Sequence, residues 1–141
     1  MIHEIDKDEK CQIMLIEKSF PQVFVENSVY RHLENPFTKV FVIKEQEELI
    51  GLMILDIIYE RMELVQIIVK EEHRQKGYAT KLMDYMLNLA KTKKLENITL
   101  EVSEDNKGAI SLYEKFGFEK CAIRSGYYQG TDGILMERKM M

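Results

Sequence analysis

The chain has 141 residues, enough for an ordinary hydrophobic core, and we expect a single domain over residues 1–141. Apolar residues make up 45% of the chain and charged residues 31%, a balance that excludes a disordered protein. The net charge of −4 argues against a broad nucleic-acid-binding face, which needs clustered Lys and Arg. No apolar run approaches the ~20 residues of a membrane span. We therefore expect neither nucleic acid nor a membrane as a partner.

The cysteines bear on the compartment and on the chemistry. Cys11 and Cys121 are too few for a disulfide framework and indicate a reducing environment. The N-terminus lacks the profile of a signal peptide, so we expect a cytoplasmic protein. Since no histidine accompanies either cysteine in a recognisable arrangement, we interpret both as packing residues rather than as nucleophiles.

The first part of the chain predicts a short strand and two helices. Residues 1–6 alternate apolar and polar side chains like a strand, and Asp6 or Asp8 can cap a helix that extends to about residue 18. A second short helix follows the loop at Phe20-Pro21 and extends to about residue 33. The expected inner face of the first helix consists of four residues at helical spacing: Cys11, Met14, Leu15 and Lys18.

The rest of the chain alternates predicted strands and helices. Strands at 37–44 and 49–58 flank a polar turn and read as a hairpin, and a third strand covers 61–69. A charged loop at 70–76 leads to a long helix that ends near residue 93. Later elements are a strand at 95–102, a short helix at 106–116 and two strands around a turn at 130–133. This mixture predicts an α/β domain with a mixed sheet.

The loop before the long helix is a candidate phosphate site. A helix start leaves backbone N–H groups unpaired and carries the positive end of the helix dipole. Small residues at Gly77 and Ala79 would let a phosphate approach these groups, while Arg74 and Lys76 add positive charge. The same pattern occurs in ordinary strand-to-helix turns, and the loop matches neither the Walker nor the dinucleotide-binding fingerprint.

A second motif makes the first more informative. Arg-x-x-Gly-x-Ala at 74–79, followed by Asn-x-x-Ala-x-x-Leu-Tyr-x-x-x-Gly-Phe at 106–118, resembles the GNAT superfamily of N-acetyltransferases. The resemblance implies a central mixed β-sheet flanked by about four helices. Leu100-Glu101-Val102, Phe20-Pro21 and the tail from Tyr127-Tyr128 to Met136 are similar to the bacterial ribosomal-protein-alanine N-acetyltransferases within that superfamily. This chain has Ser103 where that subgroup usually has arginine, and Ala79 where it has a second glycine.

The resemblance also implies how acetyl-coenzyme A would bind as a co-substrate. The pyrophosphate would lie on the backbone amides of six residues beside Arg74: Gln75, Lys76, Gly77, Tyr78, Ala79 and Thr80. The edge of the strand at Ile67, Ile68 and Val69 would pair with the amides of the pantetheine arm, as an added strand would. Asn106 would bond the far end of the arm, although its type and position suit a plain helix N-cap equally well.

Acetyl transfer to an amine needs a base for the amine and an acid for the departing thiolate. Glu101 is the candidate base, with or without an intervening water, and Tyr113 is the candidate acid. Alternatively, Glu101 is a solvated charge at a strand end, and Tyr113 is a core tyrosine. Backbone N–H groups around 67–69 are the expected oxyanion donors.

The acceptor is expected to be the N-terminus of a protein, a ribosomal protein among the candidates. Phe20, Pro21, Tyr127 and Tyr128 would clamp its first residues, unless both segments simply pack against the core. The alternatives are a small amine (a polyamine, an aminoglycoside or an amino acid) and a non-catalytic acetyl-coenzyme A sensor. We interpret residues 71–73, Glu-Glu-His, as a solvated loop and predict no metal.

Overall fold

The computed structural model describes residues 1–128 and 130–140, except for the side chains of Tyr127 and Tyr128. The predicted order of strands and helices is confirmed. The elements are β1 (Ile2–Ile5), α1 (Lys10–Ser19), α2 (Ser28–Glu34), β2 (Thr38–Glu45), β3 (Glu48–Ile58), β4 (Arg61–Val69), the short 3-10 helix η1 (Glu71–His73), α3 (Tyr78–Thr92), β5 (Asn97–Ser103), α4 (Lys107–Lys115), β6 (Glu119–Tyr128) and β7 (Thr131–Lys139). The turn expected at 130–133 is shorter than predicted, because Thr131 already begins β7.

The seven strands of the described residues form one mixed sheet in the order β1-β2-β3-β4-β5-β7-β6. The pairing of β4 with β5 is parallel, and the other neighbouring pairs are antiparallel. The connection between β4 and β5 contains α3, as a parallel crossover requires. The predicted α/β class with a mixed sheet is therefore confirmed.

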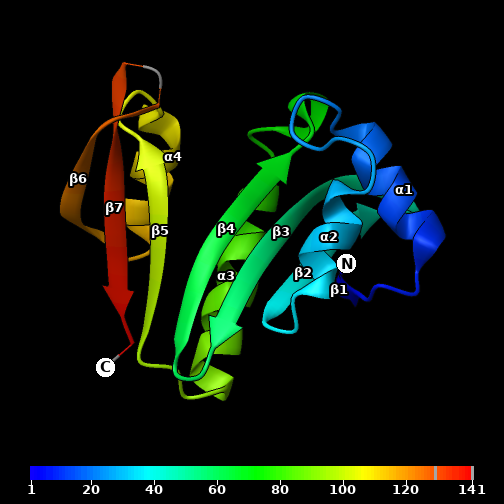
Figure 1. Ribbon diagram of the computed structural model, residues 1–141, viewed down its shortest axis with the longest axis horizontal. Coiled ribbons are helices and arrows are strands. Elements are labelled where there is room, and N and C mark those ends of the chain that lie inside the picture. Colours follow the sequence, from blue (N-terminus) through cyan, green and yellow to red (C-terminus); the bar gives the residue numbers. More distant parts are fainter. Residues whose placement is uncertain (129, 141) are drawn as a thin grey trace.

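Helices cover both faces of the sheet, as Figure 1 shows. α3 and α4 pack on one face in a core with Phe41 and Met53 of the central strands, and α1 and α2 pack on the other face with Val40 and Leu52. Because β2 and β3 are covered on both sides, they are apolar in near-continuous runs. In Figure 1, no helix of the described part of the chain lies over the second face of β5, β7 and β6.

The first helix turns a different face to the core from the one expected. Ile13, Ile16 and Glu17 are its buried residues, whereas Met14 and Leu15 are largely exposed. Both stripes have helical spacing, so periodicity alone does not separate them. Ile13 and Ile16 of this face are buried in the core, and Glu17 is accommodated beside them because its Oε2 accepts a hydrogen bond of 3.0 Å from the backbone N–H of Val29 in the first turn of α2.

Two smaller expectations near the N-terminus and at the cysteines were also wrong. Glu9, rather than Asp6 or Asp8, is the residue at the N-cap of α1. Cys11 and Cys121 are both exposed, so neither is a packing residue. Cys121 lies at a register shift between β6 and β7, and its Sγ donates a hydrogen bond of 3.4 Å to the carbonyl oxygen of Leu135.

Within the described part of the chain, no helix is both long and apolar enough to cross a bilayer.

Candidate active site

The centre of the sheet opens where β4 and β5 separate. Within the described residues, their parallel ladder extends from Arg61↔Asn97 to Leu64↔Leu100 and no further. A register shift in β4 begins just after Leu64, since Gln66 pairs with Ile54 and Leu64 with Leu55, which leaves Val65 as the extra residue of a bulge. Figure 1 shows the two strands diverging towards their carboxyl ends. A bulge bends its strand, and this bend accounts for the opening.

A pocket of about 270 Å³ fills this opening. Its walls come from β4, β5 and α4, and they include Gln66, Ile67, Glu101, Asn106 and Tyr113. Leu100 and Val102 lie in the core under α3 and α4, so Glu101 between them faces the opposite side of the sheet. Tyr113 reaches the pocket from the core side. The structure thus brings together both residues that the sequence predicted as catalytic.

Glu101 has a partner that the sequence analysis missed. Its side chain is 18% exposed, and its Oε2 lies 3.3 Å from Nε of Arg124 in β6. The two residues are 23 positions apart, and β7 lies between their strands. Sequence spacing carries no signal for this ion pair, because it depends on the order of the last three strands.

The face of the sheet that carries Glu101, opposite the one covered by α3 and α4 and here called the open face, is acidic. Asp56 of β3 pairs with Glu63 of β4, which in turn pairs with Thr99 of β5, so these three side chains share one face with Glu101. Partial burial of its carboxyl, in a residue that is exposed as a whole, raises the pKa of Glu63, and the neighbouring charges of Asp56 and Glu101 raise it further. Asp56, Glu63 and Thr99 line a second pocket of about 420 Å³ on this face.

Tyr113 is a buried residue with access to the opening. Its side chain is 7% exposed, and its ring lies 6.0 Å from that of Phe118, tilted by 58°. It is therefore a core tyrosine, as the alternative interpretation held, and at the same time part of the pocket wall. Asn106 likewise performs its alternative role, since its Oδ1 accepts a hydrogen bond of 3.2 Å from the N–H of Ala109.

The loop before α3 forms a pocket of about 270 Å³. Gly77 is the N-cap of α3 with φ of 87°, and no side chain of the described residues caps the helix there. Apart from Gly77 and its two chain neighbours, no described atom lies within 4 Å of where a Cβ on Gly77 would be, so glycine is needed for the backbone conformation and leaves open space in front of the helix. The amides of Tyr78, Ala79 and Thr80 precede the first intrahelical bond, from Lys81 N–H to the Gly77 carbonyl.

Arg74 and the end of β4 join this loop to the opening. Nε of Arg74 donates a hydrogen bond of 3.1 Å to the carbonyl oxygen of Val69, which anchors the arginine beside the loop. Ile67, Ile68 and Val69 pair with β3 on one edge, and on the other edge the described residues give them no strand partner. The predicted strand edge and the predicted phosphate loop are therefore continuous in space.

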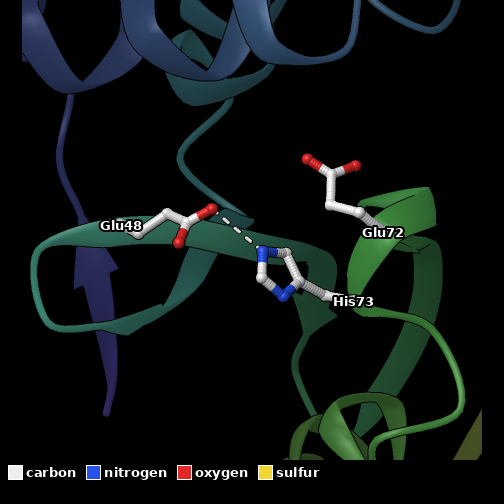
Figure 2. Close-up of side chains that lie close together, drawn as sticks. All are labelled: Glu48, Glu72 and His73. Carbon is white, nitrogen blue, oxygen red and sulfur yellow. Dashed lines mark hydrogen bonds and ion pairs between the residues drawn. The ribbon is translucent and has the colours of Figure 1, made fainter.

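A cluster of one histidine and two glutamates, His73, Glu48 and Glu72, borders the loop pocket (Figure 2). Nε2 of His73 lies 2.9 Å from Oε2 of Glu48, and this hydrogen bond lowers the pKa of Glu48. Figure 2 shows Glu72 on the same turn as His73, and one ligand atom from each of the three lies within 4.8 Å of the others. The sequence analysis missed Glu48, which comes from the start of β3. Because Nε2 already bonds Glu48, we interpret the cluster as a tie between β3 and the loop, and the absence of a metal remains a prediction.

The residues predicted to hold the acceptor have different surroundings. Phe20 is 5% exposed and packs in the core under α1 and α2, which supports the packing alternative for its side chain. Pro21 is exposed and lines a separate pocket of about 670 Å³ together with Met14 and Glu26. The side chains of Tyr127 and Tyr128 lie outside the described part of the structure.

Comparison with known proteins agrees with this architecture. Residues 6–118 match the Acetyltransferase (GNAT) family. The chain belongs to the GNAT family. It is therefore an acetyltransferase with the GNAT fold, as the two motifs implied. A Bacillus subtilis relative, a putative [ribosomal protein bS18]-alanine N-acetyltransferase, is 31% identical over 121 residues, which cover 84% of this chain and 80% of the relative.

Two solved structures show the same fold. The ribosomal-protein-S18-alanine N-acetyltransferase from Escherichia coli superimposes with a TM-score of 0.87 at 19% identity, covering 99% of this GNAT chain and 93% of its own. A GNAT family acetyltransferase from Elizabethkingia anophelis, solved with acetyl-CoA bound, gives a TM-score of 0.79 at 22% identity, covering 99% and 97%.

Proposed function

We propose that this GNAT chain transfers the acetyl group of acetyl-coenzyme A directly to the α-amino group of a protein N-terminus. One observation carries the proposal: a single pocket between β4 and β5 is lined by a carboxylate from one face of the sheet and a phenol from the other, Glu101 and Tyr113. A sensor that only binds acetyl-coenzyme A needs neither group.

Binding of the donor would use the loop and the open edge of β4. The amides at the start of α3 suit a diphosphate, and the space in front of Gly77 admits it. Arg74, fixed on Val69, and Lys76 add positive charge. The pantetheine arm carries two amides, which suit pairing with the backbone of Ile67 to Val69. The fold neighbour with acetyl-CoA bound supports this donor.

The chemistry needs one proton removed and one supplied. An α-amino group has a pKa near ~7.7–8.0, so a modest base such as Glu101 suffices to take its proton as the nitrogen attacks the thioester carbon. Backbone N–H groups of β4 would stabilise the oxyanion. When the carbon–sulfur bond breaks, Tyr113 would return a proton to the thiolate, and a phenol near ~10 and a thiol near ~8.5 are roughly matched.

The similarity to alanine N-acetyltransferases favours an α-amino acceptor, because alanine has no amine in its side chain. A ribosomal protein is the acceptor that the relative's name suggests. We propose that Pro21 and the end of β6, with Tyr127 and Tyr128, contact the first residues of the peptide. The two exposed, unpaired cysteines, Cys11 and Cys121, support a cytoplasmic location.

One observation favours a second candidate, a polyamine or another small cationic amine. Asp56 and Glu63 face the same side of the sheet as Glu101, and a cation there would offset the repulsion that adds to the effect of burial on the pKa of Glu63. A peptide with basic residues near its N-terminus would gain from the same charges.

An acceptor panel separates these proposals. Peptides that differ in their first residue, spermidine, an aminoglycoside and free alanine would be assayed with acetyl-coenzyme A by release of the free thiol. We expect the highest kcat/KM with alanine-initiated peptides, and no activity when the same peptide is blocked at its N-terminus. A preference for spermidine would establish the second candidate. Binding of acetyl-coenzyme A without turnover of any acceptor would support the sensor.

A further inference from the structure

Arg124 crosses one strand to reach Glu101. In the sheet, Gly133 of β7 lies between Ser103 of β5 and Arg124 of β6, in register with both. Glycine has no side chain, so nothing projects from β7 at Gly133 to block the Arg124 side chain as it extends across this strand. The Arg124 Nε then lies 3.3 Å from Oε2 of Glu101.

The register shift in β6 decides which face Arg124 occupies. Lys120 pairs with Met136, but Ala122 pairs with Leu135, so Cys121 is an extra residue in the strand. If the register of Lys120↔Met136 continued without this shift, Arg124 would lie opposite Asp132, on the face that packs under α3 and α4. With it Arg124 lies opposite Gly133, on the face of Glu101. Bulges of this kind commonly re-aim a side chain beside an active site.

The ion pair is more important for geometry than for stability. The Arg124 side chain is 60% exposed, and exposed ion pairs contribute little to the free energy of unfolding. Glu101, by contrast, is 18% exposed at the pocket wall, with the like charge of Glu63 on its other side. A guanidinium held on one oxygen restricts the rotation of the carboxylate, whereas repulsion from Glu63 alone would not.

We propose that Arg124 is a positioning residue that holds the Glu101 carboxylate in the pocket wall, ready to accept the proton of the acceptor amine. This inference rests on the proposed function, in which Glu101 is the base. Arg124 acts through Glu101, so its removal changes turnover and leaves binding of acetyl-coenzyme A unchanged. The bulge at Cys121 and the absence of a side chain at Gly133 allow Arg124, which lies two strands away from β5, to reach the Glu101 carboxylate.

The test is a double-mutant cycle with the purified 141-residue chain, acetyl-coenzyme A and an alanine-initiated peptide. Arg124→Gln should lower kcat about tenfold, a size within the usual range for coupling between contacting side chains. Arg124→Lys, which keeps the charge, should recover part of that loss. The acetyl-coenzyme A dissociation constant should stay within about twofold in both variants. Lys120→Gln removes a cation from the same strand, where the side chain is exposed and points to the other face, and should leave kcat unchanged.

The Glu101→Gln background separates the inference from the function. If Arg124 acts through Glu101, adding Arg124→Gln to Glu101→Gln should cause no further loss. Equal losses in both backgrounds, or no loss from Arg124→Gln alone, would overturn the positioning role while leaving the base assignment in place. An unchanged kcat in Glu101→Gln itself would remove the base assignment, and the inference with it. Thermal melting of each variant establishes that the chain is folded.

Discussion

Glu101 and Tyr113 line the same pocket from opposite faces of the sheet. This relationship exists because β4 and β5 pair only near their amino ends among the described residues and then separate. A donor lying along the open edge of β4 therefore has the core-side phenol at one side and the carboxylate of the open face at the other. In the proposed mechanism, the acceptor would approach from the face that α1 and α2 leave uncovered, without crossing the donor.

Tyr113→Phe tests the acid role. The variant keeps the ring contact with Phe118, so the fold should be retained. We expect kcat to fall by about 100-fold or more, in the usual range for general acid catalysis, with acetyl-coenzyme A affinity nearly unchanged. Tyr85→Phe is the matched control, since Tyr85 packs on Phe41 away from the opening. Equal kcat in the wild type and Tyr113→Phe would remove the assignment.

Gly77→Asp and Gly77→Asn test the phosphate loop. Both side chains tolerate positive φ better than others do, and they differ mainly in charge, so backbone strain is common to the pair. We expect Gly77→Asp to bind acetyl-coenzyme A at least about tenfold more weakly than Gly77→Asn, because its carboxylate would repel the diphosphate. Calorimetric titration gives both affinities. Similar affinities would mean that the phosphate lies elsewhere.

Glu17 should be important for stability rather than catalysis. It is 8% exposed, and its carboxylate accepts the Val29 N–H. Glu17→Leu would leave that N–H buried and unsatisfied, which we expect to lower the free energy of unfolding by about 1–3 kcal/mol. Glu17→Gln keeps an acceptor oxygen and should lose less. Denaturant unfolding measures the free energy of unfolding of both variants. An unchanged value in Glu17→Leu would show that the hydrogen bond to Val29 contributes nothing to stability.

Glu63→Gln should change the pH dependence of stability. The pKa of Glu63 is raised in the folded state, so its contribution is fully present below the unfolded value and is lost as the pH rises through the folded value. The ionised group is thus mildly destabilising at neutral pH. Since Glu63 is largely exposed, we expect Glu63→Gln to be more stable at pH 7 by no more than about 0.5 kcal/mol. The difference should vanish at acid pH, and a difference that grows there would contradict the sign.

Removal of metal should leave the activity intact. Glu48, Glu72 and His73 lie close enough to hold an ion, but Glu48 and His73 bond each other directly. We expect unchanged turnover after dialysis against a chelator. If dialysis lowered turnover, and added zinc restored it in the wild type but not in Glu72→Gln, the cluster would instead be a metal site.

The sequence by itself determined the elements and the loop. Periodicity gives the strands and helices to within a few residues, because local backbone preference and side-chain alternation are written in consecutive residues. Gly77 marks the start of α3 for the same reason, since only a local feature, φ of 87°, is required. The two motifs at their separation indicated the GNAT family, and the family match and fold agree.

Other features depended on contacts between distant residues. The inner face of α1 was predicted wrongly because a buried glutamate looks like a solvent residue until the amide of Val29 is placed beside it. Glu48 was missed because it lies 25 residues from His73 in the sequence, and only the pairing of β3 with β4 brings the two side chains together.

The tertiary structure alone decided the arrangement around the candidate base. Whether β4 and β5 stay paired depends on a bulge at Val65, and whether Arg124 meets Glu101 depends on strand order and on a second bulge at Cys121. A shift of one residue moves a side chain to the other face of the sheet, and no short-range pattern records it. The sequence therefore named the chemical groups, and the register of the strands set which of them meet.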